Sequence, residues 1–539
     1  MSVRFAAGEG GLAKAVRERQ DLLNQRQAAD VQLLTAIGGA DASATEISRK
    51  LIAALAVRLA ALDQRLSSEF PEYVQLARPK PLDLDEVRGK LKTEEVLIAF
   101  LDARYTGKLP EEEFVWVVTK TDALWMKLDL TPTQIATHVT ALRCGLDPAA
   151  WEGEGASRCS ELLGGNYGAA DARSGKPLPF DLARAHALYL GLFGKIESLI
   201  KGKRLLVVPS GPLTALPFQV MVTAKPAEAV PADARSYAKT AWLAKRHAIT
   251  VLPSVASLAG LRDFAKASKA TQPFIGFGNP LLRGPNGNDH RAWDRQTCKA
   301  PTSTIKVANR SVRSPISAFF RGGLADVQQI RAQNPLPETT DELCAVATSS
   351  GAGDAAVYLG ERATEKIIKE LSAKDRLAQA RIVHFATHGL LAGETEMLGA
   401  SKAEPALLLT PPLRATDEDD GLLTASEIAQ LRLDADWVVL SACNTAAGES
   451  SKPGAEALSG LAKAFFYAGA RALLVSHWAV NSEATVRLIT KAFAELKTDA
   501  KLGRADALRR SMVALLESGG EYGHPANWAP FVVVGEGAR

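Results

Sequence analysis

The C-terminal half of the chain alternates short apolar strands with amphipathic helices, and this alternation constrains the fold more than any other feature. The residues predicted as strands are 274–277, 357–359, 382–385, 406–409, 437–440, 472–475 and 531–534. The helices predicted between them cover about 364–373, 455–468, 483–496 and 505–516. Near-continuous apolar strands separated by helices indicate a mainly parallel sheet that is covered on both faces. We therefore expect an α/β fold, an αβα sandwich.

The first 75 residues predict a helical hairpin. Ser43 and Glu46 have capping-box spacing, and apolar residues then recur every three or four positions from Ile47 to Leu66. Pro71 ends this helix, and an earlier helix is predicted over about 12–37. The hairpin is either a structural arm that packs on the body or a docking surface for a partner.

Between these two parts lies a second α/β segment. Its predicted strands are 96–100, 114–118, 123–128, 205–208 and 249–252, with a helix over about 182–200. The predicted organisation is therefore a hairpin over 1–75, an α/β lobe over 76–268 and a second lobe over 269–539. Within the last lobe, the region near 280–337 is rich in Gly, Pro and Ser and is expected to be a flexible insertion or a functional loop.

Composition excludes several classes of protein. The 539 residues include 64 Lys plus Arg and 60 Asp plus Glu, and a net charge of +4 is not the basic excess of a dedicated nucleic-acid binder. Apolar runs fall short of the roughly 18 residues that span a membrane. The N-terminus has no apolar signal-peptide region, so a cytoplasmic location is expected.

Cysteine usage and short motifs narrow the chemistry further. The five cysteines are odd in number and widely spaced, without a C-x-x-C pair, which predicts free thiols in a reducing compartment. A P-loop, a G-x-G-x-x-G motif and a G-x-S-x-G motif are all missing from the sequence. No cofactor and no metal are expected.

Two of the predicted strands end in residues that suit nucleophilic catalysis. His388-Gly389 follows the strand 382–385, and Cys443 follows the strand 437–440. Carboxyl ends of parallel strands form the functional edge of such a sheet. A cysteine attacks as thiolate, and a nearby imidazole can take its proton and return it to the leaving amine. Backbone amides of Gly389 and Cys443 are suited to bind the oxyanion of a tetrahedral intermediate.

With these residues the chain resembles the CHAT peptidases of the caspase-like clan. The residues that carry the resemblance, besides His388-Gly389 and 440–445, are 205–218, 252–254, 421–428, 458–465, 468–471, 476–480 and 528–531. The resemblance covers about residues 95–539. It implies a degenerate caspase-like lobe followed by an active one. Members of the family often carry tetratricopeptide repeats upstream, but a 34-residue period is not found here. The chain is therefore expected to be a naturally short or a truncated form.

The resemblance implies a regulated cysteine endopeptidase that cleaves a specific protein partner. His388 would be the general base and acid, Cys443 the nucleophile, and the amides of Gly389 and Cys443 the oxyanion hole. An activator or sensor protein would bind the N-terminal helices, in a bacterial defence or stress-signalling role. The alternative is a catalytically silent CHAT scaffold that binds partner proteins.

Candidate pocket residues surround the cysteine strand and the strand that follows it. They are Ser441, Ser476, Trp478, Asn481 and Ser482. Many CHAT relatives carry an aspartate where this chain has Asn481 and Ser482, so the resemblance implies an uncharged residue before the scissile bond. The acidic residues Asp417, Asp419 and Asp420 remain an alternative source of a carboxylate in this pocket.

The other histidines have structural interpretations. His384 precedes His388 by four residues, and on a strand this spacing spans about 13 Å, which is too far for shared metal ligation. We expect His384 to be a buried, hydrogen-bonded core histidine. His477 is expected to pack, and His524 to lie in a turn before the last strand.

Overall fold

A computed structural model of the chain describes most of its residues. The described ranges are 41–69, 81–103, 110–165, 167–174, 176–264, 267–283, 290–298, 320–321, 324–390, 405–416, 418–441, 457–478, 482–499 and 501–538, together with scattered helical positions between 15 and 36.

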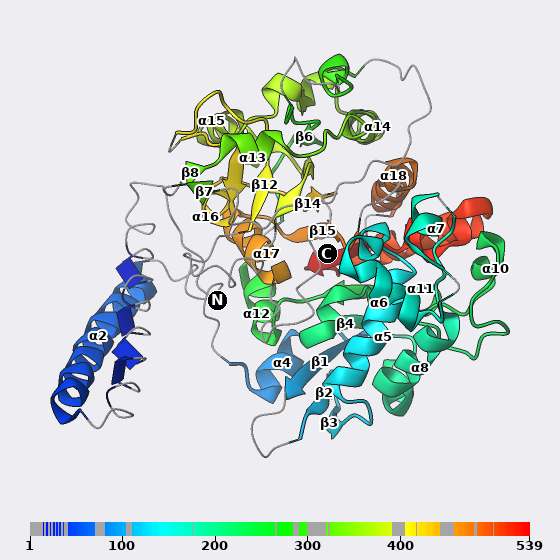
Figure 1. The fold of residues 1–539 in the computed structure, drawn as a ribbon, viewed down its shortest axis with the longest axis horizontal. Coiled ribbons are helices and arrows are strands. Elements are labelled where there is room, and N and C mark those ends of the chain that lie inside the picture. The colour runs from blue at the N-terminus through cyan, green and yellow to red at the C-terminus, as the bar shows by residue number, and fades with distance from the viewer. Residues whose placement is uncertain are drawn as a thin grey trace.

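A single 11-stranded sheet runs through the body of the molecule (Figure 1). Its strands in spatial order are β3 (Ala123–Lys127), β2 (Glu112–Val118), β1 (Glu95–Ala103), β4 (Arg204–Val208), β5 (Ile249–Val251), β16 (Phe531–Gly535), β15 (Ala472–Ser476), β14 (Trp437–Leu440), β10 (Ile382–Ala386), β6 (Ile275–Gly278) and β9 (Val357–Leu359). The predicted α/β class is confirmed.

Strand directions make one edge of this sheet the functional edge. Strands β15, β14, β10, β6 and β9 pair in parallel, one with the next. Strands β1 and β4 are parallel as well, whereas β1, β2 and β3 form an antiparallel meander and β16 runs antiparallel to β15. The carboxyl ends of β6, β10, β14 and β15 therefore meet along one edge, as expected for a ligand site in an α/β sheet.

Helices cover both faces of the sheet, and each face has its own apolar core. One core takes residues from α5 (Pro132–Cys144), α8 (Leu182–Phe193), α14 (Thr339–Ser350), α18 (Ser482–Thr498) and α19 (Arg504–Glu517). The other takes residues from α4 (Leu84–Lys90), α12 (Val255–Phe264), α15 (Glu365–Ala373), α16 (Ala425–Ile428) and α17 (Ala457–Ala468). The shorter helices are α6 (Glu154–Leu162), α7 (Ala169–Arg173), α9 (Glu197–Ile200), α10 (Ala234–Ala238), α11 (Leu243–Arg246), α13 (Val327–Arg331) and α20 (Pro525–Trp528). Successive side chains of each strand point to opposite faces of the sheet, which explains why there are two apolar cores.

One predicted strand lies outside the large sheet. Strand β12 (Ala406–Leu408) pairs antiparallel with β11 (Gly389–Leu390) and with β13 (Leu422–Thr424) in a small three-stranded sheet. The sequence prediction that put 406–409 in the main sheet is therefore wrong. An apolar run reads the same whether its partners are parallel or antiparallel, so periodicity alone could not separate the two sheets.

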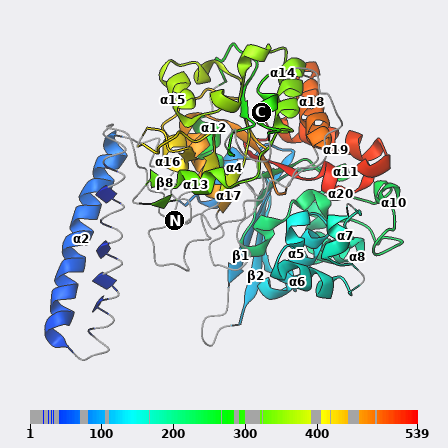
Figure 2. The same ribbon diagram turned by 45° about the horizontal axis from the view of Figure 1, so that its top comes forward.

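The N-terminal hairpin is confirmed, with a different cap. Helix α2 (Ala42–Glu69) packs along the earlier helical positions, and both lie beside the body in two views (Figures 1 and 2). The cap is Asp41, whose carboxylate accepts the amide of Ala44 at 2.9 Å, so the predicted Ser43–Glu46 box does not start the helix. Asp41 precedes Ser43 and caps at least as well, and the helix therefore begins two residues earlier.

A charged network joins the two α/β segments at the amino ends of their strands. Arg204, at the start of β4, pairs with Asp506 of α19 at 2.6 Å. Arg504, in the same turn of α19, bonds Asp436 at 3.2 Å just before β14. Strand β5 also pairs with β16, so the sheet is continuous across residue 268. The domain boundaries at 75, 76, 268 and 269 stay predictions.

The described part of the insertion 280–337 is packed. Leu281, Leu282 and Ile330 are buried. The segment contributes β7 (Phe320–Arg321), β8 (Leu324–Ala325) and α13. Residues 284–289 and 299–319 lie outside the described part, so flexibility of this insertion stays a prediction.

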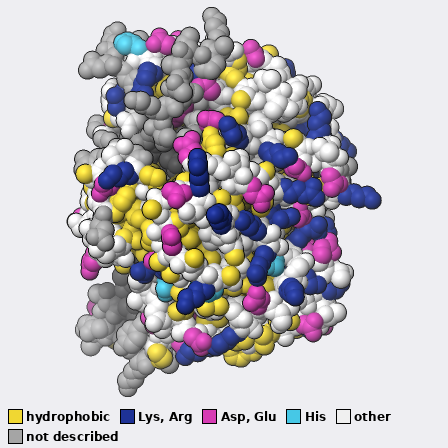
Figure 3. Space-filling view, turned by 90° about the vertical axis from the view of Figure 1, so that its right-hand side faces the viewer, with side chains coloured by type: hydrophobic (Ala, Val, Ile, Leu, Met, Phe, Trp, Pro, Cys, Tyr) yellow, Lys and Arg dark blue, Asp and Glu magenta, His cyan; other side chains and the backbone are white. Residues whose placement is uncertain are grey.

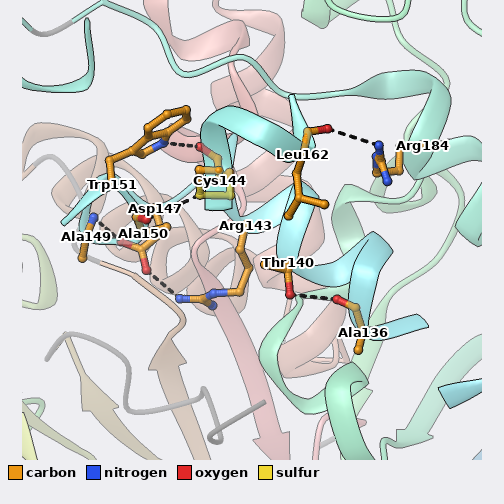
Figure 4. The surroundings of a disulfide bond; sticks show 11 residues. Ala136, Thr140, Arg143, Cys144, Asp147, Ala149, Ala150, Trp151, Leu162 and Arg184 are labelled. Atoms are coloured by element: carbon orange, nitrogen blue, oxygen red, sulfur yellow. Dashed lines mark hydrogen bonds and ion pairs between the residues drawn. A yellow bond between two sulfur atoms is a disulfide. The ribbon is translucent and has the colours of Figure 1, made fainter. Parts of the chain in front are cut away.

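Two disulfides replace the expected free thiols. Cys144 at the end of α5 bonds Cys159 of α6, and Cys298 bonds Cys344 of α14. Figure 4 shows the first disulfide beside the ion pair of Arg143 and Asp147. The prediction of five free thiols is therefore wrong. Partners 15 and 46 residues apart meet only through the tertiary fold, and spacing alone does not determine such pairing.

The surface and the helices agree with the composition. Figure 3 shows Lys and Arg side chains interspersed with Asp, Glu and apolar side chains over one face. Among the helices that the structure describes, none has the length and apolar character needed to cross a bilayer.

Candidate active site

The two strands that carry the candidate dyad are neighbours in the sheet. Strands β10 and β14 pair in parallel, and their last paired residues are Phe385 and Leu440. The amide of Ser441 then donates to the carbonyl oxygen of Phe385 at 3.1 Å, which extends the pairing by one residue. His388, which follows β10, therefore lies at the carboxyl edge of the sheet, as the sequence predicted.

His388 is fully buried where β10 turns into β11. Its Nε2 lies 2.7 Å from the carbonyl oxygen of Asn334, which is consistent with an Nε2–H that donates to this oxygen. Its own carbonyl oxygen accepts the amide of Leu408 at 2.9 Å. These contacts hold both the ring and the backbone of His388. A base that is oriented by a third group is the usual arrangement in nucleophilic catalysis.

The other two candidate catalytic residues are Gly389 and Cys443, and only Gly389 is described. Gly389 is half-buried at the start of β11 and lies opposite Leu407 of β12. Cys443, the predicted nucleophile and oxyanion-hole donor, lies outside the described residues. Both roles stay predictions.

A buried polar cluster lies on the same pair of strands. His384 of β10 is fully buried, and its Nε2 lies 3.1 Å from the hydroxyl of Ser441 and 3.0 Å from a carboxylate oxygen of Glu342. The prediction of a buried, hydrogen-bonded core histidine is confirmed. Glu342 was not predicted as a site residue. The Ser- and Thr-rich segment that forms α14 has a low helix propensity, so this helix was not predicted either. A lone acidic residue within an apolar helical face would have been the signal.

The candidate pocket segment follows β15 and is braced by the first α/β segment. Ser476, Trp478 and Ser482 are buried, and the indole nitrogen of Trp478 donates to the carbonyl oxygen of Ala526 at 2.9 Å. The guanidinium of Arg143 in α5 lies 3.5 Å from the carbonyl oxygen of His477. Asn481 lies outside the described residues. The pocket assignment of Ser441, Ser476, Trp478 and Ser482 stays a prediction.

Burial favours the neutral form of His477 and His524. Burial, with Arg143 as a second cause, lowers the pKa of His477 to about 3. Burial lowers the pKa of His524 to about 4, and His524 caps α20 ahead of β16, in the turn that was predicted. A histidine with so low a pKa is a poor general base near neutral pH. The packing role expected for His477 agrees with these values.

The acidic residues after β12 make contacts of their own. The carboxylate of Asp420 accepts the amides of Ala325 at 2.9 Å and Leu422 at 3.0 Å. The pKa of Asp419 is raised by burial, and the Lys369 cation lowers it in part. Asp417 lies outside the described residues. The carboxylate of Asp420 is thus engaged by backbone amides.

A metal site is not found in the described part of the chain, where no group of three or more His, Cys, Asp or Glu side chains could hold an ion. At the edge where β14 ends, His388 carries an imidazole, a group able to transfer a proton, and its Nε2 lies 2.7 Å from the carbonyl oxygen of Asn334.

The family model described as the CHAT domain matches residues 182–536, more than half of the chain. Tetratricopeptide repeat protein 28 of Mus musculus is 29% identical over 32% of this chain, and its Homo sapiens counterpart is 30% identical over 32%. The chain spans only 8% of the length of each of these two relatives.

Solved structures give a more distant similarity. The crystal structure of the Saccharomyces cerevisiae separase–securin complex at 2.6 Å resolution aligns with a TM-score of 0.39 and 11% identity, over 92% of this chain and 33% of that one. A second structure of the same complex, at 3.0 Å resolution, aligns with a TM-score of 0.39 and 9% identity, over 98% of this chain and 34% of that one.

Proposed function

The chain belongs to the CHAT-domain family, and from this premise we propose that it is a cysteine endopeptidase with a His388–Cys443 dyad. The observation that carries the proposal is strand register. Phe385 and Leu440 are the last paired residues of two adjacent parallel strands, and His388 and Cys443 each follow their strand's last paired residue by three positions. Adjacent strands lie about 4.8 Å apart, so equal offsets favour two side chains on one edge.

The proposed mechanism uses side chains and backbone only. His388 takes the thiol proton of Cys443, and the thiolate attacks the scissile carbonyl carbon to form a tetrahedral oxyanion. The amides of Gly389 and Cys443 stabilise that oxyanion. The imidazolium then returns the proton to the leaving amine, an acyl-enzyme forms, and water hydrolyses it with His388 again as base. The carbonyl oxygen of Asn334 orients the imidazole.

Covalent labelling tests this proposal. A peptide chloromethyl ketone should alkylate Cys443, with chloride as leaving group, and intact-mass spectrometry with peptide mapping should find one adduct at that residue. The His388→Ala variant should lose this labelling, because the thiol then lacks its base. Equal labelling of the two proteins would favour the alternative function, a catalytically silent CHAT scaffold that binds partner proteins.

The residue before the scissile bond is predicted to be uncharged. The described candidate pocket residues Ser476, Trp478 and Ser482 carry no charge, and the carboxylate of Asp420 is engaged by two amides. A buried Lys or Arg without a partner costs several kcal/mol, which exceeds the roughly 1–3 kcal/mol from size selection. A positional peptide library should therefore show at least about tenfold preference for Leu or Met over Lys or Arg. Dominant cleavage after Arg or Lys would contradict this pocket.

A partner protein is proposed to bind the N-terminal hairpin. Ile47, Leu51 and Val57 of α2 are exposed apolar side chains. Tyr467 of α17 packs against the core of the hairpin, and α17 follows the segment that contains Cys443. A partner bound at the hairpin would therefore act on the active site through α17. A role in bacterial defence or stress signalling belongs to the same proposal.

The cellular location is a separate question. A cytoplasmic location stays a prediction, and the two disulfides argue against it, because disulfides persist mainly in oxidising compartments.

A further inference from the structure

Helix α14 and the residues just before it contact strand β10 and the histidine that follows it. The carbonyl oxygen of Asn334 lies 2.7 Å from Nε2 of His388. Eight residues further along the chain, Glu342 of α14 lies 3.0 Å from Nε2 of His384, which is part of β10. The same nitrogen lies 3.1 Å from the hydroxyl of Ser441, directly after β14, so His384 links the segment 334–342 to the end of the cysteine strand.

The second contact is fully buried. Glu342 and His384 have exposed fractions of 0% and Ser441 of 3%. Phe274 lies edge-on to the imidazole, with ring centroids 6.1 Å apart. Polar groups are costly to bury, and an apolar side chain of similar volume is often neutral or stabilising in their place. Stability therefore gives no reason to keep a carboxylate here, and a functional reason is indicated.

The geometry defines how the three side chains interact. Nδ1 of His384 makes no hydrogen bond within the described part of the chain. A buried N–H without an acceptor is rarer than a bare ring nitrogen, so we assign the proton to Nε2. This one N–H donates to the Ser441 hydroxyl, and a carboxylate oxygen of Glu342 lies 3.0 Å from the same nitrogen in a close polar contact without a hydrogen bond to it. Glu342 thereby restrains the ring of His384 by electrostatic contact and packing, and the ring holds Ser441 by its hydrogen bond.

Ser441 is the last anchor of β14 before Cys443. Its amide donates to the carbonyl oxygen of Phe385 at 3.1 Å, and its hydroxyl contacts His384 at 3.1 Å. Cys443 follows two residues later in the sequence. We propose that Glu342 and His384 are positioning residues, which act through Ser441 to hold the strand end that carries the nucleophile. This inference rests on the proposed function.

The test measures reactivity and stability separately. The second-order rate constant for labelling by a peptide chloromethyl ketone is measured across pH on the full chain, per folded molecule. Glu342→Leu removes the carboxylate at similar volume, and Ser441→Ala removes the hydroxyl. Each should slow labelling about tenfold to a hundredfold, and the pH midpoint should move toward the value of about 8.5 of a free thiol. Glu342→Leu should unfold at the same temperature as the wild type or higher.

Two further variants separate positioning from packing. Glu342→Gln keeps a polar side chain of the same shape beside the imidazole and should stay within about threefold of the wild-type rate. His247→Gln is the matched control, because His247 is also buried and bonds the carbonyl oxygen of Lys203 at 2.8 Å, at the amino end of β5. It should lower the melting temperature and leave the rate per folded molecule and the pH midpoint unchanged.

The outcomes that overturn the inference are distinct from failure of the proposed function. Wild-type rates and midpoints in Glu342→Leu and Ser441→Ala would overturn the positioning role. An equal loss of rate in His247→Gln would do so as well, because it would show general loosening. If His388→Ala and Cys443→Ser also label at the wild-type rate, the dyad itself is wrong. If these two lose labelling while Glu342→Leu and Ser441→Ala keep it, only the positioning role fails.

Discussion

Replacement of Cys443 by alanine should abolish peptide-bond cleavage while the fold is retained. The thiolate is the proposed nucleophile, and loss of a nucleophile typically lowers kcat by several orders of magnitude. The fold should survive because the change removes a single sulfur atom at a strand end. Cleavage of a peptide substrate measures the first effect, and circular dichroism with a melting curve measures the second.

A double variant that removes one disulfide is the matched control for Cys443→Ala. Cys144→Ala with Cys159→Ala removes two other cysteines, at the end of α5 and in α6, and should cost stability while some turnover per folded molecule persists. Full activity in Cys443→Ala would refute the mechanism. Full loss in both proteins would point to a general requirement for an intact fold and would remove the support for this nucleophile.

Removal of the guanidinium of Arg262 should strongly destabilise the molecule. Arg262 of α12 pairs with Glu95 at 2.7 Å and with Glu536 at 3.0 Å. Both carboxylates are buried, Glu95 completely, and Arg262→Met would leave two buried charges without a cation. Breaking a buried pair from one side costs about 3–5 kcal/mol. Urea unfolding followed by tryptophan fluorescence should show a clear shift of the midpoint to lower urea.

An exposed ion pair provides the comparison for Arg262. Arg246 and Glu197 pair at 3.1 Å with about half of each side chain exposed, so Arg246→Met should change stability by less than about 1 kcal/mol. Adding Glu95→Gln and Glu536→Gln to Arg262→Met should restore part of the loss, because no buried charge then lacks a partner. Equal urea midpoints for Arg262→Met and Arg246→Met would contradict the assignment.

The position of the Arg262 network explains the size of this effect. Glu95 begins β1 in the first α/β segment, and Glu536 follows β16, the last strand of the chain. Arg262 lies on α12, near the end of the first segment in sequence. The three residues therefore join parts of the sheet that are more than 400 positions apart in the chain.

Local patterns in the sequence were sufficient to predict the main elements. Apolar runs such as 382–385 and 437–440 are strands β10 and β14, and the helices predicted near 483–496 and 505–516 are α18 and α19. His388 lies at the carboxyl edge as expected, because the end of an apolar strand is visible in the sequence and parallel strands share one functional edge. The recurrence of leucine up to Leu66 likewise predicted the helix α2.

Pairing between distant segments was decided only by the tertiary structure. The sequence by itself determined most strands, the long amphipathic helices α2, α18 and α19, the family, and the position of His388 at a strand end, since each depends on neighbouring residues. The structure alone brought Cys298 to Cys344, moved β12 into a small antiparallel sheet, and placed Glu342 against His384. These contacts join residues tens of positions apart, and only the packing of α14 on the sheet determines which side chains meet.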